Sequence, residues 1–216
     1  MNARVETSPR SVDSAPGARH KVTPRQMAHV VLKTNQYDKM IDWWQTVLDA
    51  QVVLRRPNAT FLTFDDEHHR VAIVNVPRLR PSDVNRCGVD HIAYTYAELP
   101  DLLYTYKRLR DRGIRPRWCP GSMLLLSLYY QDPDGNRIQI QWDVNSSAEQ
   151  MERFQNDPSF VTNPFGAPFD PEDVLRAYES GASIETILKI PQYPAGTAFK
   201  DIMNEMGLGD IDVTNG

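Results

Sequence analysis

The chain has 216 residues, of which 41% are hydrophobic and 24% are charged, and its formal net charge is −4. This length suits one domain of about 150 residues with extensions, or two small modules. The slight acidity and the lack of a Lys/Arg run argue against a nucleic-acid partner, and no apolar run approaches a membrane span. The N-terminus lacks the apolar core of a signal peptide, and Cys87 and Cys119 form no Cys-x-x-Cys pair, so we expect a cytoplasmic protein with two incidental thiols.

Residues 1–22 are rich in Ser, Pro, Ala and charge and show no periodicity, which predicts a disordered tail. A first module follows over residues 26–76. We expect a strand at 27–33 and a helix at 37–48, where apolar residues recur at helical spacing. Three short strands complete this module, at 51–54, 60–64 and 71–76.

The same order recurs in a second module over residues 88–143. The predicted elements are a strand at 89–96, a helix at 99–112 that Gly113 ends, and strands at 114–118, 124–130 and 138–142. The repeat is visible as an offset of 62 residues that aligns His29 with His91. One such module is too small to bury its sheet on both faces. The sequence therefore predicts an α+β fold, in which two βαβββ modules form one curved, partly open mixed sheet around a cavity.

The last strand carries an unusual polar face. The segment Asp132-Pro-Asp-Gly-Asn predicts a tight turn, and alternation then places Ile138, Ile140 and Trp142 on one face of the strand. Gln139, Gln141 and Asp143 fall on the other face. Beyond it, residues 144–216 leave the repeat and predict a helical extension that packs on the core, with Asp170 capping a helix to about residue 180. Further helices are expected at 183–190 and 197–206.

His29 and His91 occupy the same position in the two modules, and we expect both to lie mid-strand on the face away from the helices. Equivalent positions in a duplicated curved sheet converge on its pseudo-twofold axis, and two converging imidazoles make a natural site for a divalent metal. The alternative is two structural histidines satisfied by their neighbours. A third ligand should come from the last strand of the second module. That residue is Gln139, whose counterpart Ala72 cannot ligate a metal.

Four stretches, in order, resemble the vicinal oxygen chelate superfamily, and within it the short extradiol-type ring-cleavage dioxygenases. They are Ala28-His-Val-Val-Leu, Asp65-Asp-Glu-His-His-Arg-Val-Ala-Ile, Gly88-Val-Asp-His-Ile-Ala-Tyr, and Ser127-Leu-Tyr-Tyr-Gln-Asp-Pro-Asp-Gly-Asn-Arg-Ile. This resemblance covers about residues 26–143. It implies a small-molecule substrate and Fe(2+) or another divalent metal.

The resemblance also implies residue roles. His29 and His91 match the two metal histidines, with Gln139 where the family normally carries glutamate. His69 matches a histidine that works as acid and base and steadies bound oxygen, and Tyr129 matches a tyrosine that binds a substrate oxygen. The alternatives without a catalytic role are that His69 is an exposed hairpin histidine and that Tyr129 is a core aromatic residue. A second cavity histidine of the family is missing after Trp118-Cys119. If the leucines that stand there instead face the cavity, the substrate is bulkier and more apolar than a simple catechol; otherwise they form a buried strand.

Because an amide carbonyl carries no charge, Gln139 should weaken iron binding and make ferrous iron harder to oxidise. We therefore carry three interpretations: a metal-dependent dioxygenase, the same fold used for isomerisation, cyclisation or elimination with or without metal, and a ligand-sequestering protein. One chain supplies all three proposed ligands, so a homodimer is allowed but not required.

Overall fold

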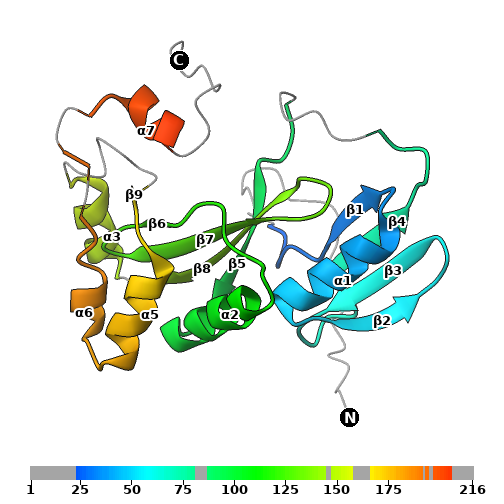
Figure 1. The fold of residues 1–216 in the computed structure, drawn as a ribbon, viewed down its shortest axis with the longest axis horizontal. Coiled ribbons are helices and arrows are strands. Elements are labelled where there is room, and N and C mark those ends of the chain that lie inside the picture. Colours follow the sequence, from blue (N-terminus) through cyan, green and yellow to red (C-terminus); the bar gives the residue numbers. More distant parts are fainter. Residues whose placement is uncertain are drawn as a thin grey trace, which may run out of the picture.

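The computed structural model describes residues 23–80, 87–144, 147–157, 166–191, 193–194 and 197–205. The predicted disordered tail, residues 1–22, lies outside these ranges. Figure 1 shows the elements, whose bounds are β1 (Val30–Thr34), α1 (Tyr37–Leu48), β2 (Gln51–Arg55), β3 (Ala59–Thr63), β4 (Val71–Asn75), β5 (His91–Tyr96), α2 (Leu99–Asp111), β6 (Pro120–Gly121), β7 (Leu125–Gln131), β8 (Arg137–Asp143), α3 (Ala148–Gln155), β9 (Ala167–Pro168), α5 (Pro171–Glu179), α6 (Ile184–Ile187) and α7 (Phe199–Glu205).

The strands in these ranges form two mixed sheets of related topology. The first has the order β1-β4-β3-β2, and the second has the order β5-β8-β7-β6-β9. In each module the first strand runs parallel to the last, and the remaining pairs are antiparallel. The α+β class and the paired βαβββ modules are confirmed. The expected single curved sheet is built from two sheets that are hydrogen-bonded separately.

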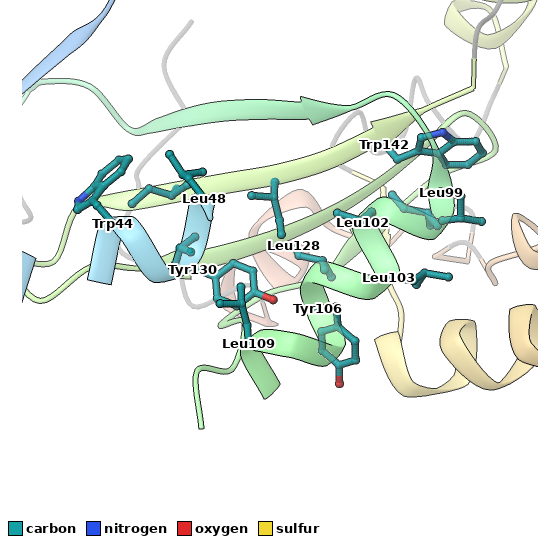
Figure 2. Packing of buried hydrophobic residues seen from close by; sticks show 14 of the residues in the cluster. Trp44, Leu48, Leu99, Leu102, Leu103, Tyr106, Leu109, Leu128, Tyr130 and Trp142 are labelled. Atoms are coloured by element: carbon teal, nitrogen blue, oxygen red, sulfur yellow. The ribbon is translucent and has the colours of Figure 1, made fainter. Parts of the chain in front are cut away.

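One helix of each module packs on the same side of the two sheets (Figure 1). The apolar stripe of α2 is buried against the alternate residues Leu128, Tyr130 and Trp142 of β7 and β8 (Figure 2). The helix α1 is anchored to the second module, because Arg108 donates to the carbonyl oxygens of Thr46 and Val47. Helix-facing apolar residues and opposite-facing polar residues thus alternate along β8, as predicted.

Three predicted strands differ from those observed by two residues or more, and one of them is β5, which begins at His91 rather than at residue 89. The first strand begins at Val30 rather than at residue 27. The expected strand at 114–118 is not regular; Trp118 makes an isolated bridge to Tyr129, and the short β6 follows it. Pro116 explains this difference, since a proline inside a strand cannot donate to the hydrogen-bond ladder.

The extension after residue 144 packs on the second module. The strand β9 pairs with β6, and α5 lies against α2. Asp170 caps α5 as expected, with Oδ1 accepting from the backbone N–H of Glu172 at 2.8 Å. The sequence did not predict α3. None of the helices in the described ranges is long and apolar enough to cross a membrane.

Candidate functional site

The two paired histidines lie at the beginnings of equivalent strands. His29 immediately precedes β1, and His91 is the first residue of β5, so the expectation that both lie mid-strand is wrong. Their equivalence nevertheless holds. Val30 donates its backbone N–H to the carbonyl oxygen of Arg70 at 3.0 Å, and His91 is in register with Arg137. Each histidine therefore lies beside the arginine at the start of the last strand of its own module, Arg70 just before β4 and Arg137 as the first residue of β8.

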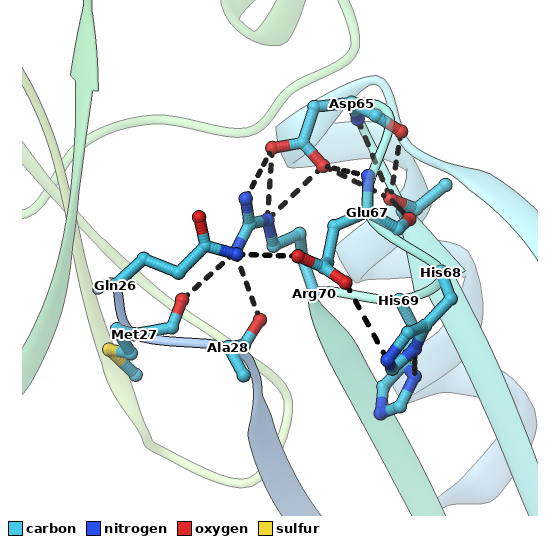
Figure 3. Close-up of polar contacts among 9 residues, drawn as sticks. Gln26, Met27, Ala28, Asp65, Glu67, His68, His69 and Arg70 are labelled. Atoms are coloured by element: carbon cyan, nitrogen blue, oxygen red, sulfur yellow. Dashed lines mark hydrogen bonds and ion pairs between the residues drawn. The ribbon is translucent and has the colours of Figure 1, made fainter. Parts of the chain in front are cut away.

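Arg70 fixes the segment that leads into His29 (Figure 3). Its Nη1 donates to the carbonyl oxygens of Met27 at 2.9 Å and Ala28 at 3.1 Å. Its Nε donates to both carboxylate oxygens of Asp65, at 3.1 and 2.9 Å. Arg70 and Asp65 thus tie the residues before His29 to the turn before β4. The Arg70 guanidinium also lowers the pKa of Asp65, which keeps this pair charged.

His69 lies against His29, with 4.3 Å between the two ring centroids. The rings of Phe61 and His69 also meet in a T-shaped contact, with 5.0 Å between their centroids. The Nδ1 atoms of His68 and His69 are 2.5 Å apart. Partial burial lowers the pKa of His69, and the neighbouring imidazoles of His29 and His68 lower it further. The ring is half-buried, unlike a freely exposed hairpin histidine.

His91 has its own set of partners in the second module. Its Nδ1 is 2.7 Å from Oδ2 of Asp90, and Arg137 contacts the same carboxylate at 3.3 Å. A carboxylate on one ring nitrogen selects the tautomer that leaves Nε2 unprotonated. The Tyr129 ring meets the His91 ring edge-on, with the centroids 5.2 Å apart.

Gln139 is buried within a polar stripe on the sheet face opposite α2. Its Oε1 accepts a hydrogen bond of 2.9 Å from the Tyr129 hydroxyl. Its Nε2 donates to Oγ of Ser127 at 2.8 Å and to Oε1 of Gln141 at 2.6 Å. Burial raises the pKa of Tyr129 to about 12, so its hydroxyl stays protonated and can donate.

A cavity of about 220 Å³ lies where the two modules meet. It is lined by His29 and Phe64 from the first module and by Ile92 and Tyr94 of β5 from the second. The predicted site residues therefore form two contact groups, namely His29 with His69, and His91 with Tyr129 and Gln139. The cavity joins the first group to the strand that carries His91.

Sequence reasoning placed Gln141 on the face of Gln139 without giving it a role, and it missed two further polar partners, Asp90 and Ser127. The period-two alternation of the strands could have found Ser127, because it shares a face with Tyr129, the residue in register with Gln139. The leucine run is divided: Leu126 is buried under α2, and Leu125 lies half-buried on the polar face, in register with Asp143. This arrangement favours the buried-strand interpretation for Leu126.

The donor set has a clear limit. Within the described part of the chain, no three His, Cys, Asp or Glu side chains gather into a group that could hold a metal. A three-ligand site among these residues therefore needs a donor from another residue type, and the Gln139 carbonyl is the one that the sequence predicts. That oxygen has two lone pairs, of which the Tyr129 hydroxyl uses one.

Comparisons with known proteins give the family. The model of the Glyoxalase/Bleomycin resistance protein/Dioxygenase superfamily matches residues 26–140. Biphenyl-2,3-diol 1,2-dioxygenase 2 of Rhodococcus globerulus is 42% identical, over 76% of this chain and 87% of that protein. Biphenyl-2,3-diol 1,2-dioxygenase 3 of the same organism is 40% identical, over 74% of this chain and 85% of that protein.

A solved glyoxalase/dioxygenase from Nostoc punctiforme aligns with a TM-score of 0.48 and 18% identity, covering 59% of this chain and 99% of that one. The two curated relatives support the expectation of an enzyme of the dioxygenase type. The family match spans both modules and includes all the predicted site residues. The chain therefore belongs to the glyoxalase/bleomycin resistance protein/dioxygenase superfamily.

Proposed function

We propose that this chain is an extradiol-type dioxygenase that cleaves the ring of an aryl-substituted vicinal diol, with a ferrous ion held by His29, His91 and Gln139. The observation that carries the proposal is the equivalence of the two histidines. His29 immediately precedes the first strand of its module, His91 begins the first strand of the other, and Gln139 lies on the strand that pairs with the strand of His91. The two dioxygenase relatives at 42% and 40% identity support the same chemistry.

The residues present are compatible with a divalent metal. The Asp90 contact to Nδ1 of His91 is the outer-shell arrangement that commonly orients a metal-binding imidazole through its other nitrogen. Two imidazoles and an oxygen donor make a three-ligand face that leaves positions open for other groups. Because Gln139 is neutral, the site would keep the full charge of the ion, and an anionic diol would partly neutralise it.

When bound, a ferrous ion supplies one centre at which a diol and dioxygen can meet. The side chains of the chain supply the rest. His69 lies beside His29 with a lowered pKa, so its neutral ring can accept a proton from a diol hydroxyl. The hydroxyl of Tyr129 already donates its proton to Gln139, so we assign it mainly to holding that amide in place. Toward a substrate, this hydroxyl could then act only as an acceptor, through its oxygen.

The cavity favours an aryl substituent on the diol. The Phe64 and Tyr94 rings meet edge-on with 5.6 Å between their centroids, and Ile92 and Met27 add apolar side chains to a lining that also includes Asp65 and Arg70. An aromatic ring gains both from apolar burial and from edge-to-face contact with such side chains. The two relatives act, by name, on biphenyl-2,3-diol, and we infer that a diol of this class fits this chain.

Anaerobic loading with Fe(II), followed by oxygen uptake on biphenyl-2,3-diol, tests the proposal. We expect iron near one per chain and oxygen uptake that requires the diol. His91→Ala should lose both iron and uptake. His68→Gln is the matched control for iron content alone, because His68 is an exposed imidazole outside the proposed ligand set but contacts His69. Full iron content in His91→Ala would contradict the ligand assignment.

A second candidate is an isomerase, cyclase or lyase on an oxygenated metabolite. It is favoured by one observation, the neutral Gln139, whose two ends both already have protein partners. This alternative predicts turnover under argon and in the presence of a chelator. Oxygen consumption with catechols that appears only in Gln139→Glu, and not in the natural chain, would favour it over the dioxygenase.

A further inference from the structure

A glutamine can present either of two different ends to a metal. The carbonyl oxygen of an amide can act as a ligand, whereas its NH2 group has only protons to offer. A carboxylate in the same place has no such choice, because both of its ends are oxygens. If Gln139 is a ligand, the chain therefore needs a device that fixes the orientation of this amide.

Such a device is present on the same face of β8. Nε2 of Gln141 donates to Oδ2 of Asp143 at 2.9 Å and to Oγ1 of Thr95 at 3.1 Å. Since an ionised carboxylate can only accept, the NH2 end of Gln141 must point to Asp143. Oε1 of Gln141 then points to Gln139, where it accepts from Nε2 at 2.6 Å.

The orientation of Gln141 sets the orientation of Gln139. With Nε2 of Gln139 engaged by Gln141, its Oε1 is left for the Tyr129 hydroxyl. The hydroxyls of Ser127 and Tyr129 could donate or accept, so neither dictates a direction. In this series of hydrogen bonds, Asp143 is the one group that can only accept. It therefore fixes the direction of the bonds made by Gln141 and Gln139.

The strand register shows which way the carbonyl faces. Ala93, Gln139 and Tyr129 form one row across β5, β8 and β7. His91 and Arg137 lie in the row on one side, and Thr95, Gln141 and Ser127 lie in the row on the other. The NH2 end of Gln139 bonds to the row away from His91, and its oxygen bonds to Tyr129, whose ring contacts His91.

We infer that Asp143 and Gln141 are positioning residues that keep the Gln139 carbonyl oxygen on the side of the histidines. This inference rests on the proposed metal site. Gln139 is only 5% exposed, so water does not readily replace these partners. We call the hydrogen bonds from Asp143 through Gln141 to Gln139 the relay. The relay matters when position 139 holds a glutamine and becomes dispensable when it holds a glutamate.

Asp143→Lys tests the relay by placing a donor where it now has an acceptor. Asp143 is exposed at the end of β8, so the fold should tolerate the change. Gln141 would turn its oxygen to the new ammonium and its NH2 to Gln139, and Gln139 would turn its NH2 to the histidines. We expect the affinity for Co(II), titrated under argon by its d–d absorption, to fall about tenfold or more, as outer-shell changes commonly do.

Two controls separate orientation from charge. Asp143→Asn removes the charge but keeps an acceptor, and we expect a loss below about threefold, because charges near the surface are screened. In the Gln139→Glu background, Asp143→Lys should also cost less than about threefold, because a carboxylate has no wrong end. An equal, large loss in both backgrounds would overturn the inference and show a simple charge effect.

A second readout does not need metal. In the metal-free protein, nuclear Overhauser contacts from the Gln139 side-chain NH2 should reach Gln141 and Ser127, and should move to the Tyr129 ring in Asp143→Lys. Contacts that stay unchanged in Asp143→Lys would overturn the relay even if cobalt binds. A natural chain that binds no cobalt would instead overturn the proposed function, and the same contacts would still report on the orientation of the amide.

Discussion

Nε1 of Trp44 donates a hydrogen bond of 3.2 Å to Oδ2 of Asp132, and this contact joins the helix of the first module to the turn of the second. Asp132 is only 5% exposed, and both of its oxygens are used. It accepts also from the backbone N–H groups of Asp134 and Asn136 and from the Asn136 side chain. One carboxylate thus closes its own turn and holds the two modules together.

Asp132→Asn should destabilise the protein by about 1 to 3 kcal/mol, because an amide NH2 would face donors that now have an acceptor. Chemical denaturation measures this loss. The matched control is Asp66→Asn, an exposed aspartate between β3 and β4 of the first module, which should leave the unfolding midpoint nearly unchanged. Equal midpoints for the two variants would show that the buried carboxylate does not join the modules.

Arg70→Lys should weaken metal binding more than it weakens the fold. A lysine cannot bridge Asp65 and the two carbonyl oxygens at once, so the segment before His29 would loosen. We expect Co(II) affinity to fall by about tenfold, a typical cost of losing outer support. Arg55→Lys, which alters an exposed pair with Asp38, is the control and should bind cobalt normally. Equal Co(II) affinity of Arg70→Lys and Arg55→Lys would show that the Arg70 contacts do not support the metal site.

Glu172 should give the protein a pH-dependent stability. Hydrogen bonds from the Tyr106 hydroxyl and from Arg110 lower the pKa of Glu172 and join α5 to α2. A carboxyl with a lowered folded-state pKa stabilises the fold above its unfolded value of about 4.3, and this stability is lost as pH falls through the folded-state pKa.

Melting temperatures of the natural chain and of Glu172→Gln should therefore differ at neutral pH and converge in acid. Glu179→Gln removes the partner of an exposed pair with Lys107 and serves as the control, with a small difference at every pH. A Glu172→Gln difference that stays constant down to acidic pH would show that ionisation of this carboxyl does not hold α5 in place.

The sequence predicts the fold well where the signals are local and repeated. The offset that aligns His29 with His91 identifies both modules, and alternation places Ile138 and Ile140 under the helix with Gln139 opposite. These signals suffice because strand and helix faces follow from spacing alone. The α+β class rests on them.

Other features depend on distant partners, which spacing does not reveal. The start of β1 is set by pairing with Arg70, so His29 lies before the strand rather than within it. The short β6 pairs on one side with β9, which lies nearly fifty residues further along the chain. Alternation along β8 places Asp143 and Gln141 on one face, so their contact could be predicted from the sequence. Which end of the Gln141 amide meets Asp143 is known only from the structure.

The most direct test of the proposed function is the fate of dioxygen labelled with oxygen-18. The iron-loaded chain should be given biphenyl-2,3-diol under the labelled gas, and the product examined by mass spectrometry. The proposal predicts a ring-opened product that carries both labelled oxygen atoms, lost in His91→Ala. A product without label, or one formed equally well under argon, would contradict it.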